Sequence, residues 1–170
     1  MPDAQTVGGE TDAEAWGDLL ADAYCQIGDR VMRDLPIYND ALGVEAVGFR
    51  RYNGTIVGIM ITPWFMNVTT SVDAVVRAAP GSSLRMCFPA GDVEFTLSEV
   101  AQVGRVASCS LFSPMSDFAD MAFARATAEA ALSELMRPSH SEEAISRCEP
   151  ATSTIDRRSF LRGVLTDRRG

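Results

Sequence analysis

The side chains able to act as nucleophiles, bases or metal ligands are few in this chain of 170 residues. The only histidine, His140, lies in a polar run with Glu142 and Glu143, which is typical of a loop. Any Ser-His-Asp or Cys-His catalytic unit would have to use this one residue. The four cysteines are spread along the sequence: Cys25, Cys87, Cys109 and Cys148. They form no Cys-x-x-Cys pair, so a zinc ribbon, a rubredoxin-type iron site and a thioredoxin motif are all unexpected.

All fifteen cationic residues are arginine, which argues against Schiff-base and P-loop lysine chemistry. The net charge of -8 is unevenly distributed. Residues 1–155 hold 10 Arg and 21 acids, a balance of -11, whereas residues 156–170 hold 5 Arg and 2 acids, a balance of +3. An acidic body repels nucleic acid. The charge distribution therefore predicts an acidic body that carries a separate basic tail.

No targeting or membrane segment is expected. The longest apolar stretch, Ile56 to Ile61, is far shorter than the ~18 residues that a transmembrane helix needs. The N-terminal residues are acidic and lack the basic and apolar regions of a secretory signal. These features predict a cytoplasmic location.

Two segments contain large apolar side chains in an arrangement that is unusual for a plain core. The first places Trp64, Phe65 and Met66 directly after a proline, with Asn67 following. In a strand, Trp64 and Met66 would share one face and Phe65 the other, so both faces need a cover. Packing under a helix and against the sheet edge is sufficient to explain this run. The functional interpretation is an apolar groove that binds a peptide, since Trp and Met favour such contacts.

The second segment is Cys109-Ser-Leu-Phe-Ser-Pro-Met115. A strand end followed by a helix cap explains it, and no basic partner that would activate Cys109 is visible in the sequence. In the functional interpretation its apolar members, Leu111, Phe112 and Met115, extend the same groove.

The tail contains Arg157 and Arg158, a spacer, then Phe160 and Leu161, which reproduces the core of a twin-arginine export signal. Only seven residues follow Gly163, and they include two arginines and an aspartate, so no apolar stretch follows. A short helix pairing with the acidic body is the simpler interpretation. The functional one is a mimic of a signal peptide.

The elements that position these segments begin with a helix. Thr11 and Glu14 form a capping box, and Leu35-Pro36 ends the helix. Its apolar stripe has helical spacing: Trp16, Leu19, Leu20, Ala23, Tyr24, Ile27 and Val31.

Extended segments follow. Asn53-Gly54 predicts a two-residue hairpin turn between residues 44–52 and 55–61. Further strands are expected at about 65–72, 84–88, 93–97 and 103–111. A last helix, beginning at Ser113-Pro114 or Ser116-Asp117, is expected to continue to residue 136.

The predicted fold class is α+β: an antiparallel sheet of about six strands packed with N-terminal and C-terminal helices, plus a flexible basic C-terminal tail. The expected organisation has four parts: a disordered acidic N-terminus (1–10), the folded domain (11–137), a linker (138–155) and the basic tail (156–170).

The sequence resembles the assembly chaperones of nickel-iron uptake hydrogenases, the HybE/HupJ type. The matching segments span most of residues 12–136, and the Thr-Pro-Trp-Phe-Met-Asn and Ser-Leu-Phe-Ser-Pro-Met blocks are the most specific. The segments are Leu35-Pro-Ile-Tyr-Asn39 with Leu42, Val44–Phe49, Ile61–Asn67, Phe88–Gly91 with Phe95, and Cys109–Met115 with Phe118.

The resemblance implies a cytoplasmic, non-enzymatic maturation factor, with no catalytic residue, cofactor or metal expected. Its expected partner is a nickel-iron hydrogenase subunit precursor, either the small subunit with its twin-arginine signal peptide or the large subunit, together with other hydrogenase maturation proteins. Some relatives carry a rubredoxin segment, whose Cys-x-x-Cys pairs this chain lacks. The predicted partner-binding residues are Trp64, Phe65, Met66, Asn67, Leu111, Phe112 and Met115. The signal-like tail residues are Arg157, Arg158, Phe160 and Leu161.

Two other classes stay open. One is a small redox or metal-handling accessory protein that uses its cysteines during hydrogenase maturation. The other is an enzyme with a carboxylate base, since acidic residues abound, although no pair stands out as a mechanism. The tail is further expected to compete with a signal peptide for the groove.

Overall fold

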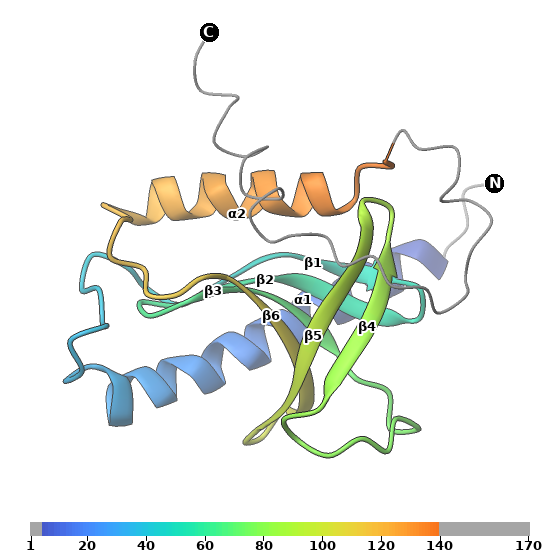
Figure 1. Ribbon diagram of the computed structural model, residues 1–170, viewed down its shortest axis with the longest axis horizontal. Coiled ribbons are helices and arrows are strands. Elements are labelled where there is room, and N and C mark those ends of the chain that lie inside the picture. The colour runs from blue at the N-terminus through green and yellow to red at the C-terminus, as the bar shows by residue number, and fades with distance from the viewer. Residues whose placement is uncertain (1–4, 140–170) are drawn as a thin grey trace, which may run out of the picture.

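The computed structural model describes residues 5–139, which form one sheet with a helix on each side (Figure 1). The strands pair antiparallel throughout, in the order β1-β2-β3-β6-β5-β4. This confirms the α+β class. The elements are α1 (Gln5–Ile27), a π-helical turn η1 (Gly28–Met32), β1 (Glu45–Tyr52), β2 (Thr55–Ile61), β3 (Met66–Ser71), β4 (Ser83–Phe88), β5 (Gly91–Val100), β6 (Gly104–Phe112) and α2 (Met121–Leu135).

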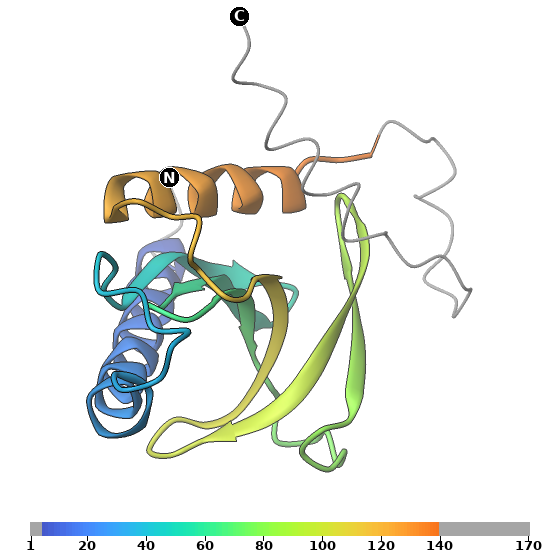
Figure 2. The same cartoon turned by 60° about the vertical axis from the view of Figure 1, so that its left-hand side comes forward.

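The sheet is strongly curved, and α2 lies across its open side (Figure 2). The main core fills the space between α2 and the concave face, with Ile59, Met66 and Phe95 fully buried there. The rings of Tyr52 on β1 and Phe88 on β4 stack with centroids 5.3 Å apart. Because β1 and β4 are the two edge strands, the sheet curls far enough to bring its edges together at this point.

The other helix, α1, packs on the convex face over β1 and β2, and its contact with the sheet includes one closely packed aromatic ring. Phe49 of β1 is buried between two glycines, Gly17 of α1 and Gly58 of β2. A Cβ atom would lie 2.9 Å from the Phe49 ring at position 17 and 2.4 Å from it at position 58. These glycines therefore let the helix approach the sheet as closely as it does.

The predicted hairpins are confirmed. Asn53 and Gly54 both adopt positive φ (+47° and +80°), which fits a type I′ turn between β1 and β2. The β4–β5 turn is shorter than expected, because Gly91 already pairs with Phe88 as the first residue of β5. Only Pro89 and Ala90 remain in the turn.

Both helices begin elsewhere than the sequence predicts. α1 begins at Gln5, so Thr11 lies inside the helix and residues 5–10, expected to be disordered, belong to it. Asp120, not Ser113 or Ser116, caps α2, and its carboxylate accepts a hydrogen bond of 2.8 Å from the amide of Phe123.

The side chain of Asn39 explains the late start of α2. Its amide nitrogen donates to the backbone carbonyls of Met115 (3.0 Å) and Phe118 (2.8 Å). These two carbonyls are thereby held in a tertiary contact outside a regular helix. The segment before Asp120 is consequently fixed as turns that seal the end of the core.

The end of α1 changes the phase of its apolar stripe. In η1 the amide of Arg33 donates to the carbonyl of Gly28, five residues back. A π-helical turn holds more residues than an α-helical one. As a result, Met32 packs against the core on the α1 side, whereas Val31, predicted to be buried, is 62% exposed.

An ion pair joins α2 to the sheet. Arg125 donates from Nε and Nη2 to the two carboxylate oxygens of Glu45 on β1, at 2.6 and 2.7 Å. These hydrogen bonds, together with the positive charge of Arg125, hold the pKa of Glu45 below its usual value against the opposing effect of its partial burial.

A depressed folded-state pKa gives stability that is present above the unfolded-state value and is lost as the pH falls through the folded-state value. We therefore expect the free energy of unfolding to decline in acid, and the Glu45→Gln variant to show a flatter decline below about pH 4.5. Urea titrations at a series of pH values measure this. An unchanged pH profile in Glu45→Gln would contradict the assignment.

Across the described residues, neither helix combines the length and apolar character that crossing a membrane would require.

Candidate functional site

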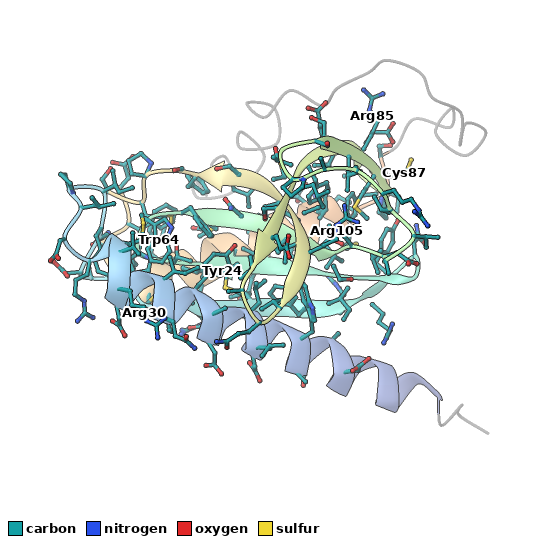
Figure 3. The ribbon with its side chains drawn as sticks, turned by 90° about the horizontal axis from the view of Figure 1, so that it is seen from below. Tyr24, Arg30, Trp64, Arg85, Cys87 and Arg105 are labelled. Atoms are coloured by element: carbon teal, nitrogen blue, oxygen red, sulfur yellow. The ribbon has the colours of Figure 1, made fainter. Side chains whose placement is uncertain are left out.

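The predicted partner-binding residues separate into buried and half-buried members. Trp64, Met66 and Met115 lie in the core. Trp64, only 6% exposed, stacks on Tyr38 with ring centroids 6.0 Å apart and meets the edge of Tyr24 at 6.4 Å. Figure 3 shows Trp64 and Tyr24 together near the C-terminal end of α1. These three predicted residues therefore shape the site from within and present little surface to a partner.

The other four predicted residues are half-buried and reach the surface: Phe65, Asn67, Leu111 and Phe112. The Phe65 ring packs edge-on against Tyr24 at 5.2 Å, and Phe112 packs edge-on against Phe118 at 5.0 Å. Asn67 offers less surface to a partner than the other three, because its Oδ1 atom is buried. That atom has no hydrogen-bond partner among the described residues. Phe65 is consequently the predicted residue best placed beside α1.

A tight turn between β2 and β3 fixes Phe65. The hydroxyl of Thr62 accepts from the amide of Phe65 at 2.9 Å and donates to the carbonyl of Phe65 at 3.0 Å. The amide of Asn39 donates to the carbonyl of Pro63 at 2.9 Å, which docks the segment after η1 onto this turn. The Thr-Pro-Trp-Phe block thus forms the β2–β3 turn and joins it to the segment after η1.

The docked segment carries the exposed apolar side chains of this region. Leu35 and Ile37 are 42% and 43% exposed, although Tyr38 beside them is half-buried on Trp64. Val31 of η1 is exposed just before them in the chain. We call Val31, Leu35, Ile37 and Phe65 the apolar end; it lies where α1 ends and several connecting loops gather, at the left of Figure 1. Exposed apolar side chains close together in the chain, as Val31, Leu35 and Ile37 are, can form an interaction surface.

The solvent-facing side of α1 is acidic. Glu14, Asp18, Asp22 and Asp29 are all exposed and follow one another at intervals of four, four and seven residues, which places them on one side of a helix. We call these four residues the acidic face. Asp29 forms an ion pair with Arg33 at 3.2 Å. The acidic face therefore leads along α1 to the apolar end.

The residues around the acidic face add to its negative electrostatic potential. Residues 5–40 contain eight acids and two arginines, a balance of -6. The negative charge also affects Cys25, which is exposed on α1. The pKa of its thiol is raised by partial burial and by the nearby carboxylates of Asp22 and Asp29. This part of the surface favours a cationic ligand.

The cysteines do not gather into a site within the part of the chain that is described. Cys25 is exposed on α1, Cys87 is exposed on β4, and Cys109 is buried on β6. Figure 3 shows Cys87 and Arg85 on the half of the sheet that lies away from the end of α1. No cluster of three or more His, Cys, Asp or Glu residues suited to a metal ion occurs among residues 5–139. A raised pKa also makes the thiol of Cys25 less reactive.

Comparison with known proteins identifies the family. The model of the NiFe-hydrogenase assembly chaperone HybE matches residues 15–163 of this chain. The chain belongs to the HybE family. The match includes the acidic face from residue 15 onward, the apolar end and, in the tail, the whole segment from Arg157 to Gly163.

Individual HybE relatives agree with this. The hydrogenase expression/formation protein HupJ of Bradyrhizobium diazoefficiens is 71% identical over 161 residues, which cover 95% of each chain. HupT of Azotobacter chroococcum is 40% identical over 144 residues, covering 84% of this chain and 91% of the relative. The solution structure of HybE from Escherichia coli superimposes with a TM-score of 0.60 at 19% identity, over 83% of this chain and 89% of that one. At this identity the likeness supports the fold alone.

Sequence reasoning missed the acidic face and most of the apolar end as a surface. Leu35 and Ile37 belong to a segment that carries the family resemblance, yet nothing in the sequence indicates that they point outward while Tyr38 points inward. Asp18, Asp22 and Asp29 are recognisable as the polar side of the helix. Their proximity to the apolar end depends on how the segment after η1 folds back onto the β2–β3 turn.

Proposed function

We propose that this protein is a non-enzymatic assembly chaperone that binds the precursor of a nickel-iron hydrogenase small subunit in the cytoplasm, through its twin-arginine signal. The observation that supports this proposal is that the exposed carboxylates of the acidic face follow α1 toward η1 and the segment after it, where the exposed side chains of the apolar end begin. A twin-arginine signal presents the complementary sequence of features, a cationic pair followed by apolar side chains.

The two parts of the surface have different roles in this proposal. The carboxylates of the acidic face attract the signal before contact, over a range of about 8 Å at physiological ionic strength. The apolar end supplies the contacts that persist once water is excluded. Phe65 and Ile37 are suited to this, since hydrogen bonds fix the backbone at or beside each residue and little backbone freedom is lost on binding.

Recovery of hydrogenase subunits from cells tests the proposal directly. The full chain is expected to retain the small-subunit precursor when the hydrogenase structural genes are expressed, and to lose it when the signal peptide is removed from that subunit. Retention of the large subunit alone would overturn the proposal in favour of a chaperone for that subunit.

Removing charge from the acidic face is expected to weaken signal binding. In the Asp18→Asn/Asp22→Asn variant two exposed carboxylates are lost, and we expect the dissociation constant for a synthetic twin-arginine peptide to rise about tenfold at low salt. The effect should shrink as salt is added. Fluorescence anisotropy of a labelled peptide measures both.

The matched control removes two carboxylates elsewhere. Glu99 on β5 and Glu129 on α2 are exposed and lie outside the acidic face. The Glu99→Gln/Glu129→Gln variant has the same net charge as the test variant, so it should bind the peptide nearly as well as the natural chain. Equal weakening in both variants would assign the attraction to net charge alone and remove the acidic face from the proposal.

A further inference from the structure

We infer that the acidic face and the apolar end also bind residues 157–162 of the same chain, so that the tail competes with a client for this surface. This inference rests on the proposed function, because it names an internal competitor for the same site. The tail segment itself lies outside the described residues.

The tail has the chemistry that the surface favours. Residues 156–163 contain three arginines and one aspartate, a balance of +2, and Arg157 and Arg158 precede Phe160 and Leu161. The HybE family match ends at residue 163, so it includes this segment and leaves out residues 164–170. The segment therefore shares both its charge and its order of features with a twin-arginine signal.

The dimensions also agree. An extended peptide advances about 3.3 Å per residue, so Arg157 and Leu161 would be about 13 Å apart. Measured along the axis of α1 at about 1.5 Å per residue, Asp18 lies about the same distance from the end of the helix at Ile27. The arginine pair can thus lie beside Asp18 and Asp22 while Phe160 and Leu161 contact the apolar end.

The attachment point permits this contact. The amide of Ser139 donates to the carbonyl of Pro89 at 3.0 Å, which fixes the end of the described chain beside the β4–β5 turn. Lengthwise, the 15 residues of α2 span about 22 Å between that point and the end of the domain where the loops gather. Because α1 lies on the other face of the sheet, the tail must also pass round the domain (Figure 1). Arg157 is the eighteenth residue after Ser139. Such a chain has a root-mean-square length of about 25 Å as a random coil and reaches about 60 Å when extended.

Tethering makes even weak binding effective. A segment joined by a linker of this length is present at its own surface at an effective concentration on the order of 1 mM. With an intrinsic dissociation constant on the order of 0.1 mM, the tail would weaken the apparent affinity for a client by about tenfold. A client signal must therefore displace the tail before it is held.

The decisive experiment compares two variants of the full chain. Arg157→Gln/Arg158→Gln removes the arginine pair, and we expect it to bind a synthetic twin-arginine peptide about tenfold more tightly than the natural chain. Arg168→Gln/Arg169→Gln removes the same charge beyond the family match and should bind like the natural chain. Calorimetry measures all three. Equal affinities for all three proteins, or an equal gain in both variants, would overturn the inference.

A second peptide separates this inference from the proposed function. A synthetic peptide of residues 154–165 is expected to bind the Arg157→Gln/Arg158→Gln variant and to shift the amide resonances of α1 and of the Thr62–Phe65 turn. If this peptide binds and the twin-arginine peptide does not, the inference stands and the proposed function fails. If only the twin-arginine peptide binds, the reverse holds. Sedimentation of the natural chain as a dimer, with the Arg157→Gln/Arg158→Gln variant as a monomer, would show that the tail binds a second copy. That result would overturn binding of the tail within one chain.

Discussion

Replacing Trp64 with alanine is expected to lower the free energy of unfolding by about 3–5 kcal/mol. The indole is buried against Tyr24 and Tyr38, and it closes the space above Gly28, where a Cβ atom would lie 3.3 Å from the indole ring. Removing the indole leaves a cavity at the junction of α1, the segment after η1 and the β2–β3 turn. Urea titration measures the loss.

This loss of stability affects the interpretation of binding experiments. Trp64→Ala would weaken client binding by destabilising the site, without any loss of direct contact. Ile37→Ser is the matched comparison. Ile37 is 43% exposed, so the change should leave the free energy of unfolding within about 0.5 kcal/mol of the natural value while still weakening binding of a twin-arginine peptide. A Trp64→Ala protein of unchanged stability would contradict the buried position that the structure gives to this ring.

Replacing Gly58 with alanine is expected to destabilise the fold by about 3 kcal/mol, the upper part of the usual range for overpacking. The added methyl group would lie 2.4 Å from the ring of Phe49. The Phe49 ring has little room to move, because Gly17 of α1 lies on its other side. The ring of Trp16 also packs against it, with centroids 5.7 Å apart. Relief requires α1 to move away from the sheet.

Gly43→Ala provides the control for this prediction. Gly43 has no atom within 4 Å of the position of a Cβ, so alanine there should change the free energy of unfolding by no more than about 0.5 kcal/mol. Thermal and urea unfolding of the two variants test the difference. Similar stability in Gly58→Ala and Gly43→Ala would show that α1 is not held against β2 through Phe49.

The strands were predictable because their signals are local. Asn53-Gly54 marks a turn by its tolerance of positive φ, and the β-branched run from Thr55 to Ile61 can only be a buried strand once that turn is placed. The same reasoning located the other strands to within a few residues. The family could also be identified from sequence, since its blocks combine residue types that short turns alone do not require.

The helix boundaries and the site depended on contacts between distant residues. Nothing near Val31 indicates a π-helical turn, and the start of α2 is set by Asn39, 81 residues before Asp120. Large apolar side chains are equally suited to a core and to a docking surface, so the sequence could not distinguish Trp64, Met66 and Met115, which are buried, from Phe65, Leu111 and Phe112, which reach the surface.

The stacking of Tyr52 on Phe88 has a consequence for a protein that would work among unfinished polypeptides. Unpaired backbone groups along the border of a sheet are templates on which other chains add as extra strands and then aggregate. By drawing β1 and β4 together, the ring pair turns the two borders toward each other near this contact. The domain can then meet extended clients at a side-chain surface with less risk of recruiting them into its own sheet.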